Sequence, residues 1–367
     1  FLTLTGLAPL TAAKVLVVTI SALNAALFSL ILRLLGLPRL IGGLFTLLFI
    51  SSACFVFWSS VIELFPFACF SILLALFLMF RIRQSTALSW ITANVLTLGL
   101  TTPNWIFGII ATAVRQKLKP FLLICTAALG FVGVVSIIQN PLFEKAAYFF
   151  NPIPLMREAN FTQPAMQAQG SYESGWQPLN NLRSLYVTTI IAMPATIEVQ
   201  NSIEIVTTNQ TSGFPTGELS PVIATVAWVI LFGLGVWGAI RHRPLRLPLI
   251  GVGLMLLFQS LLHSVYGEVT FLYSLHYLPL LVLIAACAWF SPFRHIAAVL
   301  ATVVIVFGTM NNIDRLQSTI DTAGCLSQLD SVKTYQSWDI IKTEPSRDTR
   351  PDYSPLSPAD VERCQAL

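Results

Sequence analysis

Long apolar runs separated by short polar turns dominate the chain from residue 15 to residue 310. Most of these runs are long enough to cross a hydrocarbon core about 30 Å thick as helices. The pattern therefore predicts an all-α fold, a polytopic membrane helix bundle of about ten spans. The predicted spans are Val15–Leu32, Leu40–Trp58, Leu64–Phe80, Thr86–Thr101, Asn104–Val114, Phe121–Ile138, Pro221–Ile240, Leu247–Val265, Val269–Phe290 and Ile296–Met310.

The clearest unit is a hairpin from Leu40 to Arg83. Its two apolar runs are joined by a polar elbow, Ser59–Glu63, and arginines stand only at its two outer ends. This charge pattern indicates an elbow that faces away from the cytoplasm. The fifth span is too short to cross alone, so Thr101–Asn104 marks a break in the helix and Asn104–Val114 is either a span or a re-entrant segment.

The charges are sorted by side. All 17 acids fall on the side predicted to be outside, eight between Glu63 and Glu268 and nine from Asp314 to Glu362. Basic residues without acids mark cytoplasmic turns. The predicted cytoplasmic turns carry Arg33, Arg39, Arg81, Arg83, Arg115, Lys117, Lys119, Arg241, Arg243, Arg246 and Arg294.

Composition agrees with a membrane location. The chain is 55% hydrophobic and 10% charged, whereas a soluble domain has about 25% charged residues. We expect an integral protein of a bacterial cytoplasmic (inner) membrane, with the bilayer as one partner and no nucleic acid.

Four segments follow from this pattern: membrane helices over 1–138, a long outer loop over 139–220, membrane helices over 221–310, and a polar outer tail over 311–367. In the loop, Phe143–Phe150 is typical of an interfacial helix, and Leu182–Ala195 is expected to lie on the membrane surface. In the tail, Cys325 and Cys364 are predicted to pair, because they are the only cysteines outside the apolar runs.

The polar groups gather at the outer ends of the spans. Tyr266–Tyr277 offers a carboxylate, Glu268, an imidazole, His276, and three phenols, of which Tyr273 and Tyr277 share a helix face. An acid and a histidine near one membrane surface exceed what anchoring requires. We therefore interpret this stretch as one wall of a polar cleft; an interfacial aromatic belt with one buried histidine is the alternative.

Other candidate residues lie at the same level. Glu63 occupies the first elbow, Asn104 and Trp105 lie at the outer end of the fourth and fifth spans, and Arg157 and Arg183 could pair with a lipid phosphate from the long loop. The alternatives are solvated charges for the acid and the arginines. His263 is expected to be a packed helix histidine. No Cys/His metal spacing is present.

The stretch from about Thr11 to Trp105 resembles membrane glycosyltransferases of the GT-C superfamily, which includes protein mannosyltransferases and aminoarabinose transferases. The similar features are the helix Leu23–Leu37, the elbow Phe57-Trp58-Ser59-Ser60 followed by Glu63-Leu-Phe-Pro66, and the helix that ends in Thr102-Pro-Asn104. Phe65 stands where that family often has Tyr.

The resemblance implies transfer of a sugar from a polyprenyl-phosphate donor to a glycan, lipid or protein acceptor on the outer side. It implies a carboxylate that acts as a general base or metal ligand, and a divalent metal ion is a possible cofactor. The family places its principal carboxylate in an outer loop before the helix that matches Val15–Leu32. No acid precedes Glu63 here, so we expect an N-terminally truncated member.

Three functions remain open at this point. The first is the glycosyltransferase, with Glu63, Glu268 and His276 as catalytic candidates and Asn104, Trp105, Tyr266, Tyr273, Tyr277, Arg157 and Arg183 as substrate-binding candidates. The second is a transporter or flippase of lipid-linked saccharide, and the third is a lipid-linked glycan polymerase or ligase. A transporter would place polar groups near mid-membrane with broken helices, whereas an outer-face grouping favours an enzyme.

Overall fold

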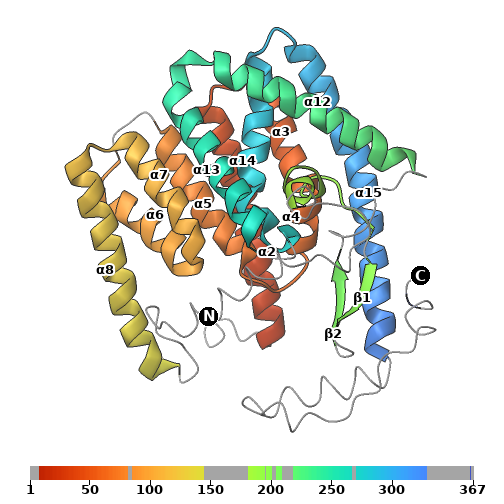
Figure 1. Ribbon diagram of the computed structural model, residues 1–367, viewed down its shortest axis with the longest axis horizontal. Coiled ribbons are helices and arrows are strands. Elements are labelled where there is room, and N and C mark those ends of the chain that lie inside the picture. The colour runs from red at the N-terminus through yellow and green to blue at the C-terminus, as the bar shows by residue number, and fades with distance from the viewer. Residues whose placement is uncertain are drawn as a thin grey trace.

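The computed structural model describes residues 8–81, 85–143, 181–194, 196–200, 204–208, 218–266, 270–328 and Cys364. Helices make up nearly all of the regular structure in these ranges (Figure 1). Two short strands, β1 (Thr196–Gln200) and β2 (Glu204–Thr208), form an antiparallel hairpin. The helical bundle is confirmed, and this hairpin is an addition that the all-α prediction did not include.

Helices occupy all ten places where the hydrophobic pattern predicts spans. Six helical segments are long and apolar enough to cross a membrane, counted over the described residues, which makes this an integral membrane protein. The helices α3, α5 and α6 are apolar but shorter, so the count of ten spans stays a prediction. The helices are α2 (Pro9–Leu34), α3 (Arg39–Ser51), α4 (Ala53–Trp58), α5 (Phe65–Phe80), α6 (Ala87–Leu100), α7 (Trp105–Arg115), α8 (Leu118–Leu142), α12 (Leu219–Arg241), α13 (Arg246–Val265), α14 (Ser274–Ala286) and α15 (Arg294–Gln328).

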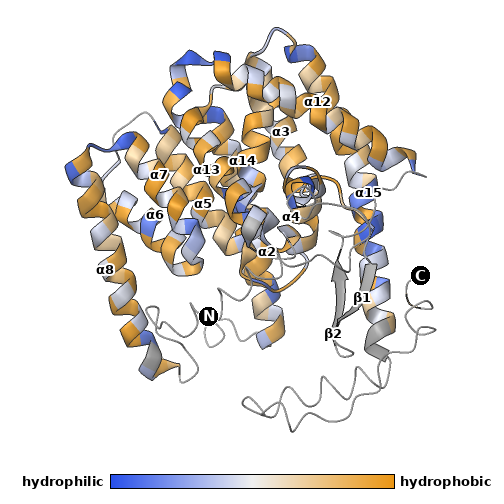
Figure 2. Ribbon diagram, in the orientation of Figure 1, coloured by the Kyte–Doolittle hydropathy of each residue, from blue (hydrophilic) through white to orange (hydrophobic). Residues whose placement is uncertain are grey.

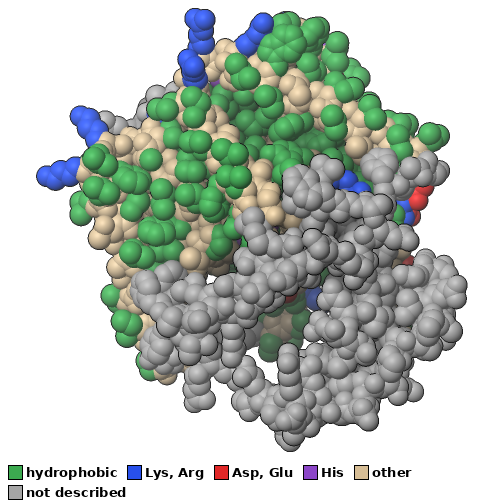
Figure 3. Space-filling model, in the orientation of Figure 1, with side chains coloured by type: hydrophobic (Ala, Val, Ile, Leu, Met, Phe, Trp, Pro, Cys, Tyr) green, Lys and Arg blue, Asp and Glu red, His purple; other side chains and the backbone are tan. Residues whose placement is uncertain are grey.

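Hydrophobic residues cover the helices, and hydrophilic ones concentrate at their ends and turns (Figure 2). Lys and Arg side chains project from the upper edge in Figure 3. We call the end of the bundle that carries Arg81, Arg115, Arg241 and Arg294 the basic face, and the opposite end the outer face. The positive-inside rule predicts that the basic face is cytoplasmic.

Helix α14 lies at the centre of the bundle. Every residue from Ser274 to Ala286 is buried, because α3, α5, α12 and α13 all pack around it. Lipid alone could surround a membrane helix that is apolar on all sides, so the burial of α14 reflects its contacts with these four helices. This arrangement gives the start of α14 a fixed position at the outer end of the core.

Helix α12 crosses the end of α14 at two glycines. A methyl group at Gly235 would overlap the carbonyl oxygen of Ile284, and one at Gly238 would overlap that of Cys287. Small residues let two helix backbones approach this closely in a membrane.

The second predicted span is broken at Ser52, whose extended backbone separates α3 from α4. The amides that the break frees are bonded by the segment 181–194: Ala53 N–H donates to Ile190 O at 2.9 Å, and Cys54 N–H donates to Thr189 O at 3.1 Å. Irregular backbone at membrane depth requires such protein partners.

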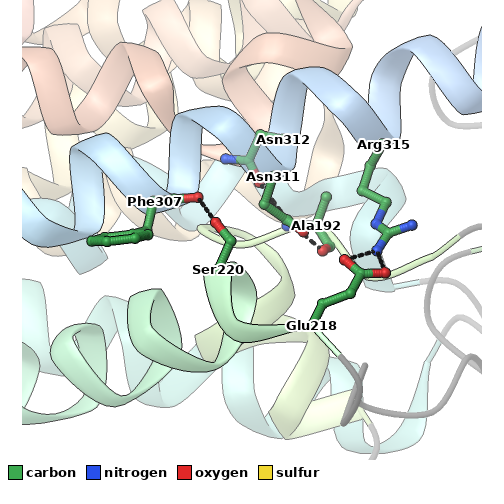
Figure 4. Close-up of polar contacts among 7 residues, drawn as sticks. All are labelled: Ala192, Glu218, Ser220, Phe307, Asn311, Asn312 and Arg315. Carbon is green, nitrogen blue, oxygen red and sulfur yellow. Dashed lines mark hydrogen bonds and ion pairs between the residues drawn. The ribbon is translucent and has the colours of Figure 1, made fainter.

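Two asparagines of α15 complete this junction (Figure 4). Asn312 Nδ2 donates to Ser51 O and Ile190 O at 2.9 Å each, and its Oδ1 accepts from Ala192 N–H at 2.8 Å. Asn311 Nδ2 donates to Ala192 O at 2.8 Å. The segment 181–194 is therefore inside the bundle, and the expectation that Leu182–Ala195 lies on the membrane surface was wrong. The sequence of this segment alone could not show that asparagines of α15, more than 100 residues away, form hydrogen bonds to it.

The remaining connections agree with the sequence. A 3₁₀ turn, Thr102–Asn104, interrupts the helix between α6 and α7, as predicted. The disulfide between Cys325 and Cys364 is confirmed, with Cα atoms 5.7 Å apart. Helix α15 continues to Gln328, well beyond the boundary predicted at residue 310. The stretch Phe143–Phe150 lies outside the described residues except for Phe143.

Candidate functional site

Aromatic and imidazole rings gather where α13 ends and α14 begins. Five of them, which we call the outer cluster, are His263, Tyr266, Tyr273, His276 and Tyr277. The Tyr273 ring centroid lies 5.3 Å from that of His263, 5.7 Å from that of His276 and 6.4 Å from that of Tyr266. The His263 and Tyr277 centroids are 5.8 Å apart. The structure therefore brings together residues that the sequence places on two helices.

The first elbow docks onto this cluster. Trp58 Nε1 donates to Phe271 O and to Ser274 Oγ, both at 3.1 Å, which fixes the end of α4 against the start of α14. The Phe65 ring then lies 6.0 Å from the His276 ring and 6.4 Å from the Tyr273 ring. The hairpin that the sequence identified thus forms a second wall of the outer cluster.

Both histidines are buried with unused ring nitrogens. His263 is 2% exposed and His276 is 3% exposed. Within the described part of the chain, neither nitrogen of His263 nor Nε2 of His276 meets a hydrogen-bond partner, although the Tyr266 backbone lies near His263. Most buried polar atoms in proteins are bonded, so the missing described partners make these nitrogens candidates for contact with a polar ligand.

Further unbonded polar atoms surround the cluster. They include Gln259 Oε1 on α13, Ser184 Oγ and Thr188 Oγ1 on the buried segment, and Ser59 Oγ in the elbow, again counted among described partners. Asn181 Nδ2 donates to His263 O at 2.6 Å and Tyr186 Oη bonds Ser260 Oγ at 2.9 Å, so the segment is held against α13. The outer end of the bundle therefore contains several buried polar atoms that have no hydrogen-bond partner among the described residues.

Four of the predicted site residues lie together, and the others are spread over the elbow, the α6–α7 turn and the loop segments. The outer cluster contains Tyr266, Tyr273, His276 and Tyr277, but the Tyr277 hydroxyl already donates to Thr270 O at 2.9 Å. Glu63 is exposed in the elbow, two residues before Phe65. Its backbone position borders the cluster, and its carboxylate forms no contact to the described residues.

Asn104 and Trp105 belong to the turn between α6 and α7. Trp105 Nε1 donates to Asn94 Oδ1 at 3.1 Å, so its indole N–H is bonded within the α6–α7 pair. Asn104 is fully buried, and neither amide atom has a described partner. Since α7 runs antiparallel to α13 with Val114 beside Gly251, a rise of 1.5 Å per residue places Asn104 at about the depth of Gln259.

Two predicted site residues, Arg157 and Glu268, lie outside the described residues. Arg183 is half-buried at the start of the buried segment, and this burial lowers its pKa. A guanidinium remains charged at physiological pH despite such a shift. Arg183 therefore supplies a fixed positive charge on the segment that packs against α13.

Sequence reasoning missed the role of α13. His263 was expected to be a packed helix histidine, and it is buried against the rings of Tyr273 and Tyr277. What was not predicted is that this packing makes it part of the outer cluster. The sequence feature that could have identified α13 as part of the site is the spacing of Gln259 and His263. They are four residues apart at the outer end of one span, which places both on one helix face. The described residues contain no group of three His, Cys, Asp or Glu side chains that could hold a metal, and the divalent metal ion stays a prediction.

A groove on the membrane-facing surface leads toward this cluster. It lies between α12 and α13, has a volume of about 520 Å³, and has Ile284 of α14 among its lining residues. Along α13 it extends from Arg246 to Ser260, one turn below His263. Its walls include exposed apolar side chains such as Ile240, Ile250 and Leu257. A hydrocarbon chain in the bilayer could enter this groove from the side.

No protein-family model matches the chain, and no curated protein or solved structure matches it.

Proposed function

We propose that this protein is an integral membrane glycosyltransferase that moves a sugar from a polyprenyl-phosphate donor to an acceptor at the outer face. The observation that carries the proposal is the groove between α12 and α13, which extends along α13 to Ser260, one helical turn from the buried His263. A lipid-linked sugar needs both environments at once: apolar contact for its chain and polar groups for its phosphate and sugar.

The Tyr186–Ser260 hydrogen bond lies at the point where the two environments meet. A lipid phosphate that reaches this level would lie one helical turn from His263. Neutral imidazoles can donate to phosphate oxygens through N–H. Arg183 adds a positive charge on the segment 181–194, which also carries Tyr186. These groups stabilise the negative charge that the departing phosphate acquires.

The transfer itself needs a base. The acceptor hydroxyl oxygen attacks the anomeric carbon, the bond from that carbon to the phosphate oxygen breaks, and the lipid phosphate leaves with the electron pair. A carboxylate takes the hydroxyl proton. We assign that role to Glu63 or Glu268, with His276 orienting the reacting groups from the buried side.

A transporter or flippase is the second candidate, because the α3–α4 break is a feature of that class. In transporters the freed backbone groups coordinate substrate or ions. Here the Ala53 and Cys54 amides are bonded by the buried segment, and Asn312 bonds Ser51 O. The break is thus closed by protein, which favours the enzyme. The third candidate, a polymerase or ligase, differs only in its acceptor, a second lipid-linked glycan.

The test is sugar release in vesicles that contain the full chain and a radiolabelled polyprenyl-phosphate sugar. We expect labelled sugar to leave the donor, and His276→Asn to slow this by about tenfold or more, which corresponds to about 1.4 kcal/mol in the barrier. Gln317→Ala, an exposed change on α15, should leave the rate unchanged, and thermal unfolding should show that both variants fold. Movement of intact donor between leaflets without sugar release would instead identify a flippase.

A further inference from the structure

The basic face has a hollow that the proposed function does not use. It lies between the turn that joins α12 to α13 and the turn that joins α14 to α15, with a volume of about 740 Å³. Its lining includes Arg241, His242, Arg243, Trp289, Arg294 and His295. The same α12–α13 turn borders a second hollow of about 680 Å³, to which Arg115 and Arg246 contribute.

The charged residues on the two turns that form the hollow are all basic. The chain contains no acid between Glu218 and Glu268, and none between Glu268 and Asp314. Neither turn that forms the hollow therefore has an acidic residue of its own. An anion that enters the hollow would meet three guanidinium groups and no carboxylate from these turns.

The arginines that line the hollow make different contacts from other arginines of the basic face. Arg115 donates to Met79 O at 2.7 Å, and Arg33 donates to Leu37 O at 2.7 Å, so both satisfy carbonyls at helix ends. Arg241 instead lies over the Trp237 ring, 5.0 Å from its centroid, and Arg294 lies 5.8 Å from the Trp289 centroid. Arg294 Nε donates to His295 Nε2 at 3.3 Å. Neither Arg241 nor Arg243 donates a hydrogen bond to the described residues, so the N–H groups of these two arginines can serve an anion.

The surroundings of the hollow suit a lipid. Tryptophan rings such as Trp237 and Trp289 favour the headgroup level of a bilayer. Exposed apolar side chains directly neighbour the lining residues in the sequence, namely Ile240 before Arg241 and Ile296 after His295, with exposed fractions of 74% and 53%. An acyl chain could lie against them while its phosphate occupies the hollow.

We propose that this hollow binds the headgroup of an anionic phospholipid from the leaflet at the basic face. The positive-inside rule explains why cations occur on these turns, but it requires neither a hollow nor guanidinium groups held at its rim with free donors. The inference is independent of the glycosyltransferase proposal, since it concerns the opposite end of the bundle.

The test compares two lipids on the purified full chain. Native mass spectrometry of the delipidated protein should show phosphatidylglycerol binding about tenfold more tightly than phosphatidylcholine. The double variant Arg243→Gln/Arg294→Gln should remove most of this preference, because it takes away two of the three guanidinium groups that would attract the phosphate. The matched control, Lys117→Gln/Lys119→Gln, loses the same charge from the exposed α7–α8 turn and should retain the preference within twofold.

Equal losses in the two double variants would overturn the proposal, because they would show general attraction to a basic surface. Displacement of phosphatidylglycerol by inorganic phosphate would also overturn it, in favour of a soluble anion.

A second measurement covers the case in which the arginine variant does not fold. His295→Cys places an exposed thiol in the hollow, and phosphatidylglycerol in the vesicle should slow its alkylation severalfold, while Lys119→Cys should react at the same rate in both lipids. Equal rates at residue 295 would contradict the proposal.

Discussion

Asn312 shows how one side chain can determine where a whole segment lies. It donates to two carbonyls, Ser51 O and Ile190 O, and accepts from the Ala192 amide. Its neighbour Asn311 forms one bond to the same segment and one to Asn312 itself. Both are buried (Figure 4). In the low-dielectric interior of a bundle, bonds of this kind replace the water that a surface loop would use.

The first prediction follows from the different hydrogen bonds that Asn312 and Asn311 form. Asn312→Ala removes three hydrogen bonds: Ser51 O and the Ala192 amide lose their described partner, and Ile190 O keeps only its bond from Ala53 N–H. We expect this change to lower the free energy of unfolding by about 2–4 kcal/mol. Asn311→Ala removes fewer bonds and should cost about 1 kcal/mol. Thermal unfolding in detergent measures both. Equal losses would show that the burial of the segment does not depend on the Asn312 bonds.

At the scale of elements, the hydrophobic pattern predicted where the helices lie. Each predicted span coincides with a helix, and the interruption before Trp105 was predicted from Thr101–Asn104. The break at Ser52 was not predicted, because serine is tolerated within membrane helices and the carbonyls that bond the freed amides belong to residues 189 and 190. Tertiary partners far away in sequence decided both the break and the burial of the segment.

The same reasoning explains what could be predicted of the candidate site. Tyr273 directly precedes α14, and His276 and Tyr277 lie in its first turn, so their close spacing in the sequence revealed their grouping. The contributions of His263 and Phe65 depend on how α13 and the first hairpin pack against α14, which no local pattern reports. Glu268 and Arg157 stay predictions.

The second prediction concerns the crossing of α12 and α14. Gly238→Ala places a methyl group against the Cys287 carbonyl, and backbone atoms cannot move aside cheaply. We expect a loss of about 1–3 kcal/mol in stability, measured as a lower thermal midpoint. Gly233→Ala on the same helix meets nothing within 4 Å and should be neutral or slightly stabilising. A neutral Gly238→Ala would contradict the close crossing.

At the scale of the whole molecule, the two ends of the bundle differ in charge and in chemistry. The basic face carries arginines with no acid on its turns, whereas the outer face carries Glu63 and the buried histidines. The third prediction is that these ends lie on opposite sides of the membrane. In intact cells, an impermeant thiol reagent should label Ser60→Cys and spare Lys119→Cys; permeabilisation should expose the latter. The reverse pattern would place the outer cluster in the cytoplasm.

The central claim is that a lipid-linked sugar reaches the outer cluster along the groove between α12 and α13. Its most direct test is a photoreactive polyprenyl phosphate, incorporated into vesicles with the full chain and mapped by mass spectrometry after illumination. We predict crosslinks concentrated on groove residues, such as Phe232, Leu256 and Leu257, and suppressed by excess unlabelled polyprenyl phosphate. Crosslinks spread evenly over exposed apolar residues of α8, such as Leu123 and Phe131, without competition, would contradict the claim.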